Sequence, residues 1–108
     1  MKNNKQKMIF DFSLYPLDKG DSLSKFVSNS MKIIEESGLP YKFGAMSTSI
    51  EGTWNECMQV IETCHQKMQE QSERIVLNLK VDYRKDRKDG IINKIASVEN
   101  KVGHKLKI

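Results

Sequence analysis

The segment from Thr48 to Trp54 carries the side chains best suited to binding chemistry. It places the carboxylate of Glu51 and the hydroxyl of Thr48 close to the apolar side chains of Ile50 and Trp54. The segment lies between a strand-like stretch and a strongly amphipathic stretch, so both polar groups would be held on regular structure. No redox, metal or nucleophile motif competes with it elsewhere in the chain. These features indicate a small binding module rather than an enzyme.

The cysteines and histidines do not form a reactive group. Cys57 and Cys64 lie on one predicted helix, about 10 Å apart along its axis, which is too far for a disulfide. They are predicted to be free thiols in the core. Cys64 and His65 lack the further, closely spaced ligands of a zinc site, and they point to different helix faces. With no glycine-rich phosphate loop either, we expect no catalytic residue, no metal and no cofactor.

Length and charge indicate one small cytoplasmic domain. The chain has 108 residues and a formal net charge of +4. Residues 1–7 are predicted to form a disordered basic tail, and residues 8–103 a single domain. The basic residues of 84–88 are interleaved with aspartates, which is typical of a solvated loop rather than a nucleic-acid surface. Neither a signal peptide nor a membrane span is recognisable, so no membrane partner is expected.

Alternating and helical spacing predicts the first half of the fold. Apolar residues alternate over 8–14, with Met8, Phe10, Phe12 and Leu14 on one face of a strand that Pro16 ends. Helical spacing follows over 22–37, with Asp21 or Ser22 as the N-cap and Gly38 after the last turn. Strands are predicted over 41–47 and 48–53, joined by a tight turn near residues 46–47.

The second half repeats this pattern. A helix begins at Trp54, with Thr53 as its cap and Glu56 completing a capping box. A strand follows over 75–84, and a last helix runs from Asp89 or Gly90 to Gly103. The order β-α-β-β-α-β plus a C-terminal helix predicts an α+β, ferredoxin-like fold, in which an antiparallel sheet has both inner helices on one face.

The other sheet face is predicted to need a cover. It would carry the apolar Ile9, Tyr15 and Val76 beside polar residues, namely Ser13, Glu51, Asn78 and Asp82. That is too much apolar surface to remain wholly in water. A ligand, a second subunit or the final helix would cover it.

Three segments also match a known family. Residues 12–17 (Phe-Ser-Leu-Tyr-Pro-Leu), 46–54 (Met-Ser-Thr-Ser-Ile-Glu-Gly-Thr-Trp) and 81–86 (Val-Asp-Tyr-Arg-Lys-Asp) occur in this order. They resemble the thiamine-binding protein family of small ferredoxin-like domains, the YkoF-type proteins, over residues 8–102. The chain departs from the family pattern at Tyr83, where relatives often have a second aspartate. The resemblance implies a non-catalytic protein that binds thiamine or its hydroxymethylpyrimidine half. It also implies self-association through the sheets, as a dimer or a dimer of dimers.

The residues can supply the contacts that an aminopyrimidine requires. Glu51 could accept a hydrogen bond from the exocyclic amine, and Thr48 or Ser49 could offer a hydroxyl. A flat ring could lie against Phe12, Tyr15 or Trp54, and a thiazolium cation near Asp11 or Asp82. The predicted ligand-binding residues are Ser13, Tyr15, Thr48, Ser49, Glu51, Trp54 and Asp82. Asp11 and Arg84 are predicted at the ligand or at a subunit interface.

Other interpretations remain open. Glu51 could form a cross-strand ion pair with Lys80. The domain could be a ligand-free assembly or regulatory module that oligomerises through its sheet. An RNA-binding ferredoxin-like domain is a further alternative, but it needs aromatic residues on the open face. Here Phe10 and Phe12 belong to the helix side, and a carboxylate at Glu51 would repel phosphate.

Overall fold

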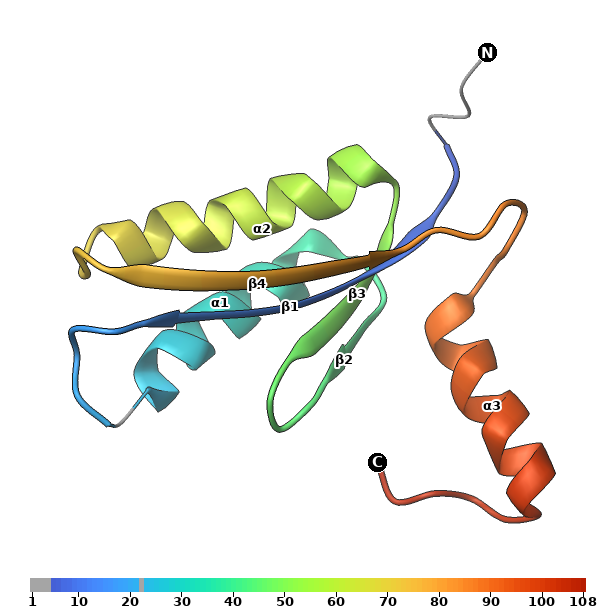
Figure 1. The fold of residues 1–108 in the computed structure, drawn as a ribbon. Coiled ribbons are helices and arrows are strands. Elements are labelled where there is room, and N and C mark those ends of the chain that lie inside the picture. The colour runs from blue at the N-terminus through green and yellow to red at the C-terminus, as the bar shows by residue number, and fades with distance from the viewer. Residues whose placement is uncertain (1–4, 22) are drawn as a thin grey trace.

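The computed structural model describes residues 5–21 and 23–108 and has the predicted ferredoxin-like α+β order (Figure 1). Its elements are β1 (Met8–Pro16), α1 (Ser24–Ser37), β2 (Tyr41–Phe43), β3 (Thr48–Gly52), α2 (Trp54–Gln69), β4 (Ile75–Asp82) and α3 (Gly90–Val102). The four strands form one antiparallel sheet in the order β2-β3-β1-β4. β1 and β3 are therefore the central strands, and they carry the segments that the sequence analysis singled out.

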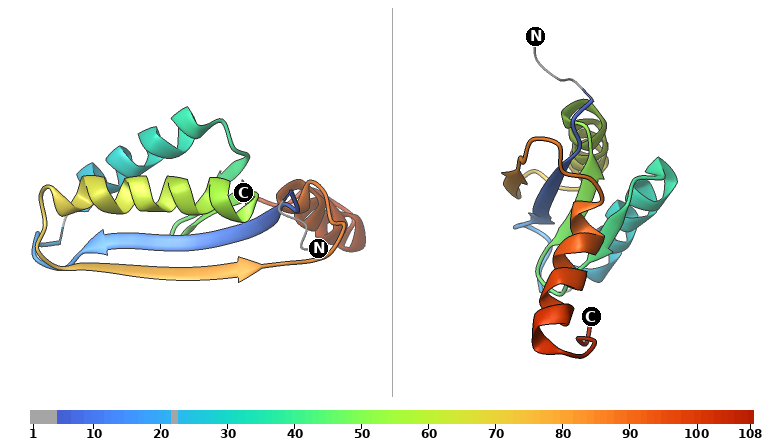
Figure 2. Two further views of the ribbon diagram at one scale, coloured as in Figure 1. Left: turned by 90° about the horizontal axis from the view of Figure 1, so that it is seen from above. Right: turned by 90° about the vertical axis from the view of Figure 1, so that its right-hand side faces the viewer.

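The core lies between one face of the sheet and the helices α1 and α2. Both helices cover the same face, and α3 lies apart from them near one end of the sheet (Figure 2). Phe10, Phe12 and Leu14 of β1 are buried against this layer, as their alternation predicts. Ile50 and Ile61 complete the centre of the core. Because Phe10 and Phe12 are buried there, they cannot offer a base-stacking platform on the open face.

The edge strand β4 is less well covered. Leu77 and Leu79 lie on the same side as the core residues of β1, but they are 38% and 37% exposed. The reason is the position of β4 at the edge of the sheet, while α2 packs over β1 and β3. An edge strand with exposed leucines is a surface on which another chain could pair.

The helix ends follow the predicted signals with one exception. Thr53 caps α2 in a full capping box, because the Glu56 N–H donates to Thr53 Oγ1 (3.2 Å) and the Thr53 N–H donates to Glu56 Oε1 (2.9 Å). Gly38 ends α1 in the left-handed conformation, with φ 75°. Asp21 does not cap α1, since the capping position is Leu23, which has no side-chain acceptor. Ser22, the other predicted cap, lies outside the described residues.

The turn between β2 and β3 differs from the prediction. β2 ends at Phe43 rather than at Ser47, and residues 44–47 form the turn. The Gly44 N–H donates to the Ser47 carbonyl oxygen at 2.9 Å. A Cβ at position 44 would lie only 2.7 Å from that same oxygen, so the close approach requires glycine.

The predicted disordered tail is wrong for Gln6. This side chain is buried and bridges the start of β1 to the loop between β4 and α3. Its Nε2 donates to the carbonyl oxygens of Lys7 (2.8 Å) and Arg87 (3.1 Å), and its Oε1 accepts from the Asp86 N–H (2.8 Å). These bonds satisfy backbone groups of Asp86 and Arg87 in the loop between β4 and α3. Gln6 is therefore part of the folded domain, which begins before Met8. Residues 1–4 lie outside the described part of the chain.

The cysteines are free and buried, as predicted. Burial raises the pKa of the Cys57 thiol to about 12 and that of the Cys64 thiol to about 11. Both thiols are therefore protonated at neutral pH, and the thiolate is the reactive form. We expect neither to react with a thiol reagent at pH 8 in the folded protein, and both to react in denaturant. Rapid modification of the native protein, measured by mass spectrometry, would contradict this placement.

The helices of the described residues are all too short or too polar to cross a membrane.

Candidate functional site

Most of the predicted site residues that border a hollow fall into two groups, one in a cleft beside α1 and one in a groove on the open face. Side chains alternate along a strand, so Thr48 faces the helices, whereas Ser49 and Glu51 face the other way. Ser13, Tyr15 and Thr48 line a cleft beside α1. Asp11, Ser49 and Asp82 line a groove on the open face beside α3. The structure thus brings together two groups of predicted residues rather than one.

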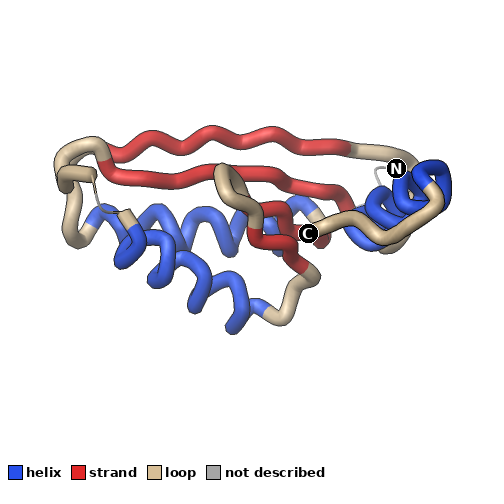
Figure 3. Tube along the Cα trace, turned by 90° about the horizontal axis from the view of Figure 1, so that it is seen from below, coloured by secondary structure: helices blue, strands red, loops and turns tan. Residues whose placement is uncertain are grey.

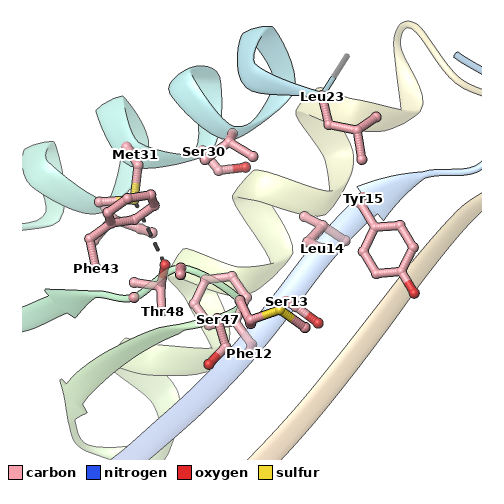
Figure 4. Close-up of a pocket in the computed structure, with 15 residues that line it drawn as sticks. Phe12, Ser13, Leu14, Tyr15, Leu23, Ser30, Met31, Phe43, Ser47 and Thr48 are labelled. Atoms are coloured by element: carbon pink, nitrogen blue, oxygen red, sulfur yellow. Dashed lines mark hydrogen bonds between the residues drawn. The ribbon is translucent and has the colours of Figure 1, made fainter. Parts of the chain in front are cut away.

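The cleft lies just beyond the point where β3 stops pairing with β1. β3 pairs with β1 only from Met8 to Phe12, so on this side of β1 no described strand pairs with Ser13 to Tyr15, while β4 continues to pair with its other side. Side chains from both faces of this stretch border the cleft, which explains how Ser13 and Phe12 reach the same space. The other walls are α1 and the turn at residues 44–47 (Figure 4). The cavity volume is about 220 Å³.

The cleft is apolar, and its walls carry no charged side chain among the described residues. Its apolar surface includes the aromatic rings of Phe12, Tyr15 and Phe43, with Met31 on α1 facing Phe43 (Figure 4). Such walls suit a flat, neutral ring.

Hydroxyl groups supply the polarity of the cleft. They belong to Ser13, Ser30, Ser47 and Thr48, and to the phenol ring of Tyr15. Thr48 is buried, and its Oγ1 donates to the sulfur of Met31 at 3.9 Å and to no other described residue. A thioether is a weak acceptor, so this hydroxyl can turn to a better partner at little cost. The arrangement can therefore bind a neutral heterocycle that presents both donors and acceptors.

The groove on the open face is charged. By strand register, Lys42 lies opposite Ser49, Ser49 opposite Asp11, and Asp11 opposite Lys80. This row crosses all four strands and borders a hollow of about 350 Å³. The apolar part of the lining is formed by Ile9, Ile91 and Ile95.

Asp82, which also lines the groove, forms ion pairs with two basic side chains. Its Oδ2 accepts from Lys94 Nζ at 2.6 Å and from an Arg87 guanidinium N–H at 2.9 Å. These hydrogen bonds from Lys94 and Arg87 hold the pKa of the Asp82 carboxyl below its usual value. They also link α3 to the end of β4.

Asp11 holds the turn between β2 and β3 from the open face. Its Oδ1 accepts from the hydroxyls of Ser47 (3.0 Å) and Ser49 (2.9 Å). Ser47 belongs to the turn that walls the cleft, so Asp11 fixes the cleft without lining it.

Glu51 holds the N-terminus of α3. It is only 3% exposed, and its Oε2 and Oε1 accept from the N–H groups of Gly90 (2.6 Å) and Ile91 (3.1 Å). The first N–H groups of a helix have no partner within it and attract a negative charge. Asp89, at the capping position, makes no such bond because it adopts a left-handed conformation, with φ 51°. The alternative of an ion pair between Glu51 and Lys80 is wrong, since both carboxylate oxygens serve α3.

The other predicted residues lie away from both hollows. Trp54 is half exposed at the start of α2, where its ring packs edge-on against Phe10 with centroids 5.4 Å apart. Arg84 is exposed in the loop after β4. Among the described residues, no group of histidine, cysteine or acidic side chains could hold a metal ion.

Further residues, which the sequence pattern did not single out as site residues, complete each hollow. In the cleft these are chiefly Ser30 and Met31 of α1 and Phe43 of β2. A serine within the apolar stripe of a helix was an available signal for Ser30. In the groove they are Lys42 and the α3 residues Ile91, Lys94 and Ile95. Nothing local marks these, because the position of α3 depends on distant contacts.

Known proteins match nearly the whole chain. A family model described as thiamine-binding protein matches residues 10–99. A UPF0045 protein of Mycobacterium tuberculosis is 35% identical over 89 residues, covering 82% of this chain and 87% of that protein. A UPF0045 protein of Methanocaldococcus jannaschii, MJ1052, is 30% identical over 93 residues, covering 86% of this chain and 93% of that protein.

Solved structures have the same fold. The crystal structure of MJ1052 superposes with a TM-score of 0.80 at 30% identity, covering 86% of this chain and 96% of that one. A Thermotoga maritima protein, described as a candidate in thiamine biosynthesis or salvage, has a TM-score of 0.75 at 22% identity, covering 85% and 98%. The description of the matching family names a binding protein and no reaction. On the family match, which spans nearly the whole chain, the protein belongs to the thiamine-binding protein family.

Proposed function

We propose that this protein binds the hydroxymethylpyrimidine part of thiamine, or the free pyrimidine, in the cleft between α1, β1 and the turn at residues 44–47. Binding is non-catalytic and uses no further cofactor. The observation that carries this proposal is the composition of the cleft, in which the aromatic and aliphatic walls carry serine, threonine and tyrosine hydroxyls and no charged side chain among the described residues. Membership of the thiamine-binding family, together with the description of the Thermotoga maritima protein, supports the choice of ligand.

The chemistry of the two halves of thiamine favours the pyrimidine as the buried part. The aminopyrimidine is neutral, flat and rich in hydrogen-bonding groups, which the hydroxyls of Ser30 and Thr48 can serve as donors or acceptors. The thiazolium carries a positive charge, and a neutral apolar wall gives that charge no compensation. We therefore place the thiazolium at the mouth of the cleft, in solvent.

The size of the cleft agrees with a single buried ring. Pockets for drug-sized ligands have volumes of roughly 300–1,000 Å³, and the cleft has about 220 Å³. Phe43 and Met46 lie at its mouth and are 54% and 89% exposed. These two side chains have room to close over a ring that has entered.

Calorimetric titration with thiamine and, separately, with hydroxymethylpyrimidine tests the proposal. We expect saturable binding of both. Thr48→Val keeps the shape of the side chain and removes its hydroxyl, so affinity should fall about tenfold for one lost hydrogen bond.

Ser49→Ala is the matched control for this titration. Ser49 is the next residue of the same strand, but its side chain faces the open side. We expect this variant to bind like the wild type. If Ser49→Ala weakens binding and Thr48→Val does not, the ligand binds on the open face instead. No heat with either ligand would refute the proposed ligand.

Self-association is a second candidate function, and the exposed edge strand favours it. Leu77 and Leu79 are more than a third exposed on β4, whose outer edge pairs with no strand among the described residues. Burying these leucines against a second copy would stabilise a dimer. Sedimentation equilibrium of the wild type and of Leu79→Lys distinguishes the outcomes. A monomer at all concentrations would exclude assembly, and a dimer that Leu79→Lys leaves intact would place the interface elsewhere.

A further inference from the structure

We propose that the groove on the open face, beside α3, is a second binding site, for a small organic anion with an apolar body, such as an aryl phosphate or an aryl carboxylate. The proposal goes beyond the pyrimidine site, because it concerns the opposite face of the sheet and a different chemical class of ligand. It rests on the geometry of α3, on the unpaired lysines and on the apolar end of the hollow.

The wall that α3 provides is fixed at two points. Its N-terminus is bonded to the buried carboxylate of Glu51, and Lys94, one turn further on, is bonded to Asp82 at 2.6 Å. Figure 3 shows this helix beside the end of the sheet, away from the two core helices. These links fix the position of Ile91 and Ile95, which line the hollow together with Ile9. The groove is therefore formed before any ligand arrives, which lowers the entropic cost of binding.

The positive charges of the groove are only partly used within the protein. Lys94 is paired with Asp82, but Lys42 and Lys80 have no carboxylate within ion-pair distance among the described residues. They come from β2 and β4, so their Cα atoms are about 14 Å apart across the sheet. Both side chains border the same hollow from opposite sides. An anion placed between them would meet two ammonium groups that form no ion pair with a described carboxylate, although Asp11 lies opposite Lys80 in the strand register.

The carboxylate of Asp11 would repel a bound anion, but its hydrogen-bond partners weaken this repulsion. Its Oδ1 already accepts hydrogen bonds from the hydroxyls of Ser47 and Ser49, which stabilise and disperse the negative charge. Asp82, the other carboxylate of the lining, is neutralised by Arg87 and Lys94. A cationic ligand would have to displace or approach three lysines to reach Asp11. With three lysines and two aspartates in its lining, the groove favours an anionic ligand over a cationic one.

The apolar end of the groove defines the rest of the ligand. Ile9 is buried at its floor, and Ile91 and Ile95 are half-buried at its wall. A bare inorganic anion would use the lysines and leave this apolar surface in water. An anion that carries an aromatic or aliphatic group would cover it, so phenyl phosphate should bind more tightly than inorganic phosphate.

Titration with phenyl phosphate at low salt, followed by amide chemical shifts, tests the site. We expect shifts that saturate and are confined to Ser49, Lys80 and the first turns of α3. Lys42→Gln and Lys80→Gln should each weaken binding about three- to tenfold. Lys101→Gln, at the far end of α3, is the matched control and should have no effect. Asp11→Asn keeps the acceptor for Ser47 and Ser49 while removing the charge, so it should strengthen binding.

Several results would overturn this proposal. Equal weakening by Lys101→Gln, or shifts spread over the whole surface, would show non-specific attraction to a basic protein. Tighter binding of benzylamine than of phenyl phosphate would show a cation site at Asp11. The two proposals can be tested independently. Thr48→Val should leave phenyl phosphate binding unchanged, and hydroxymethylpyrimidine carries no anionic group that the groove would bind.

Discussion

Replacing Glu51 by alanine should release α3 and lower the free energy of unfolding by about 3 kcal/mol. The carboxylate is 3% exposed and accepts from the N–H groups of Gly90 and Ile91. Its removal leaves these donors without an acceptor inside the protein and takes a negative charge from a helix N-terminus. Urea denaturation and amide hydrogen exchange at Gly90 and Ile91 measure the effect. Exchange there should become faster than in the core strands.

Two further variants make the Glu51 result specific. Glu51→Gln retains one carbonyl acceptor, so its destabilisation should be smaller than that of Glu51→Ala. Glu62→Ala, on the exposed surface of α2, should change stability by less than about 0.5 kcal/mol. If Glu51→Ala behaves like Glu62→Ala, the carboxylate does not hold α3.

The same variants separate the two proposed sites. The sequence alone predicts that Glu51→Gln weakens pyrimidine binding. From the structure we expect Glu51→Gln to leave pyrimidine binding unchanged, because Glu51 does not line the cleft. Binding of phenyl phosphate should weaken instead, since α3 forms one wall of the groove. A large loss of pyrimidine affinity in Glu51→Gln would show that Glu51 contacts the ligand after all.

Replacing Asp11 by alanine should loosen the turn at residues 44–47 and lower the free energy of unfolding by about 2 kcal/mol. One carboxylate oxygen accepts from both Ser47 and Ser49, so the change removes two charge-assisted hydrogen bonds at once. The freed turn forms a wall of the cleft, and pyrimidine affinity should therefore fall although Asp11 does not line it. Hydrogen exchange at residues 44–47 and calorimetry measure the two effects.

The serine variants identify which bond controls the cleft. Ser47 lies in the turn, whereas Ser49 lies within β3, where the sheet already fixes the backbone. Ser47→Ala should reproduce much of the loss of affinity, and Ser49→Ala should not. Asp11→Asn should restore both turn and affinity, because an amide oxygen is still an acceptor. If Asp11→Asn is as damaging as Asp11→Ala, the charge itself matters and the positioning role is wrong.

The sequence by itself determined the order of the elements and the face of β1 that forms the core. Alternation in β1 assigns Phe10 and Phe12 to the helix side, because successive side chains of a strand must point to opposite faces. The capping box at Thr53 and the glycine after α1 involve residues within four positions of each other, so the local sequence specifies them. The family resemblance rests on such local segments, and the family match confirms it.

Only the tertiary structure decided which side chains share a site. Glu51 and Gly90 are 39 residues apart, and their hydrogen bond exists because α3 returns to the sheet. Gln6 and Asp86 are 80 residues apart and meet because β1 and the loop after β4 adjoin. Alternation also separates Thr48 from Ser49, although a reader of the sequence sees one continuous polar segment. Glu51 and Gln6 acquire their roles from the unsatisfied donors and acceptors that folding brings to them, and those partners lie far away in the sequence.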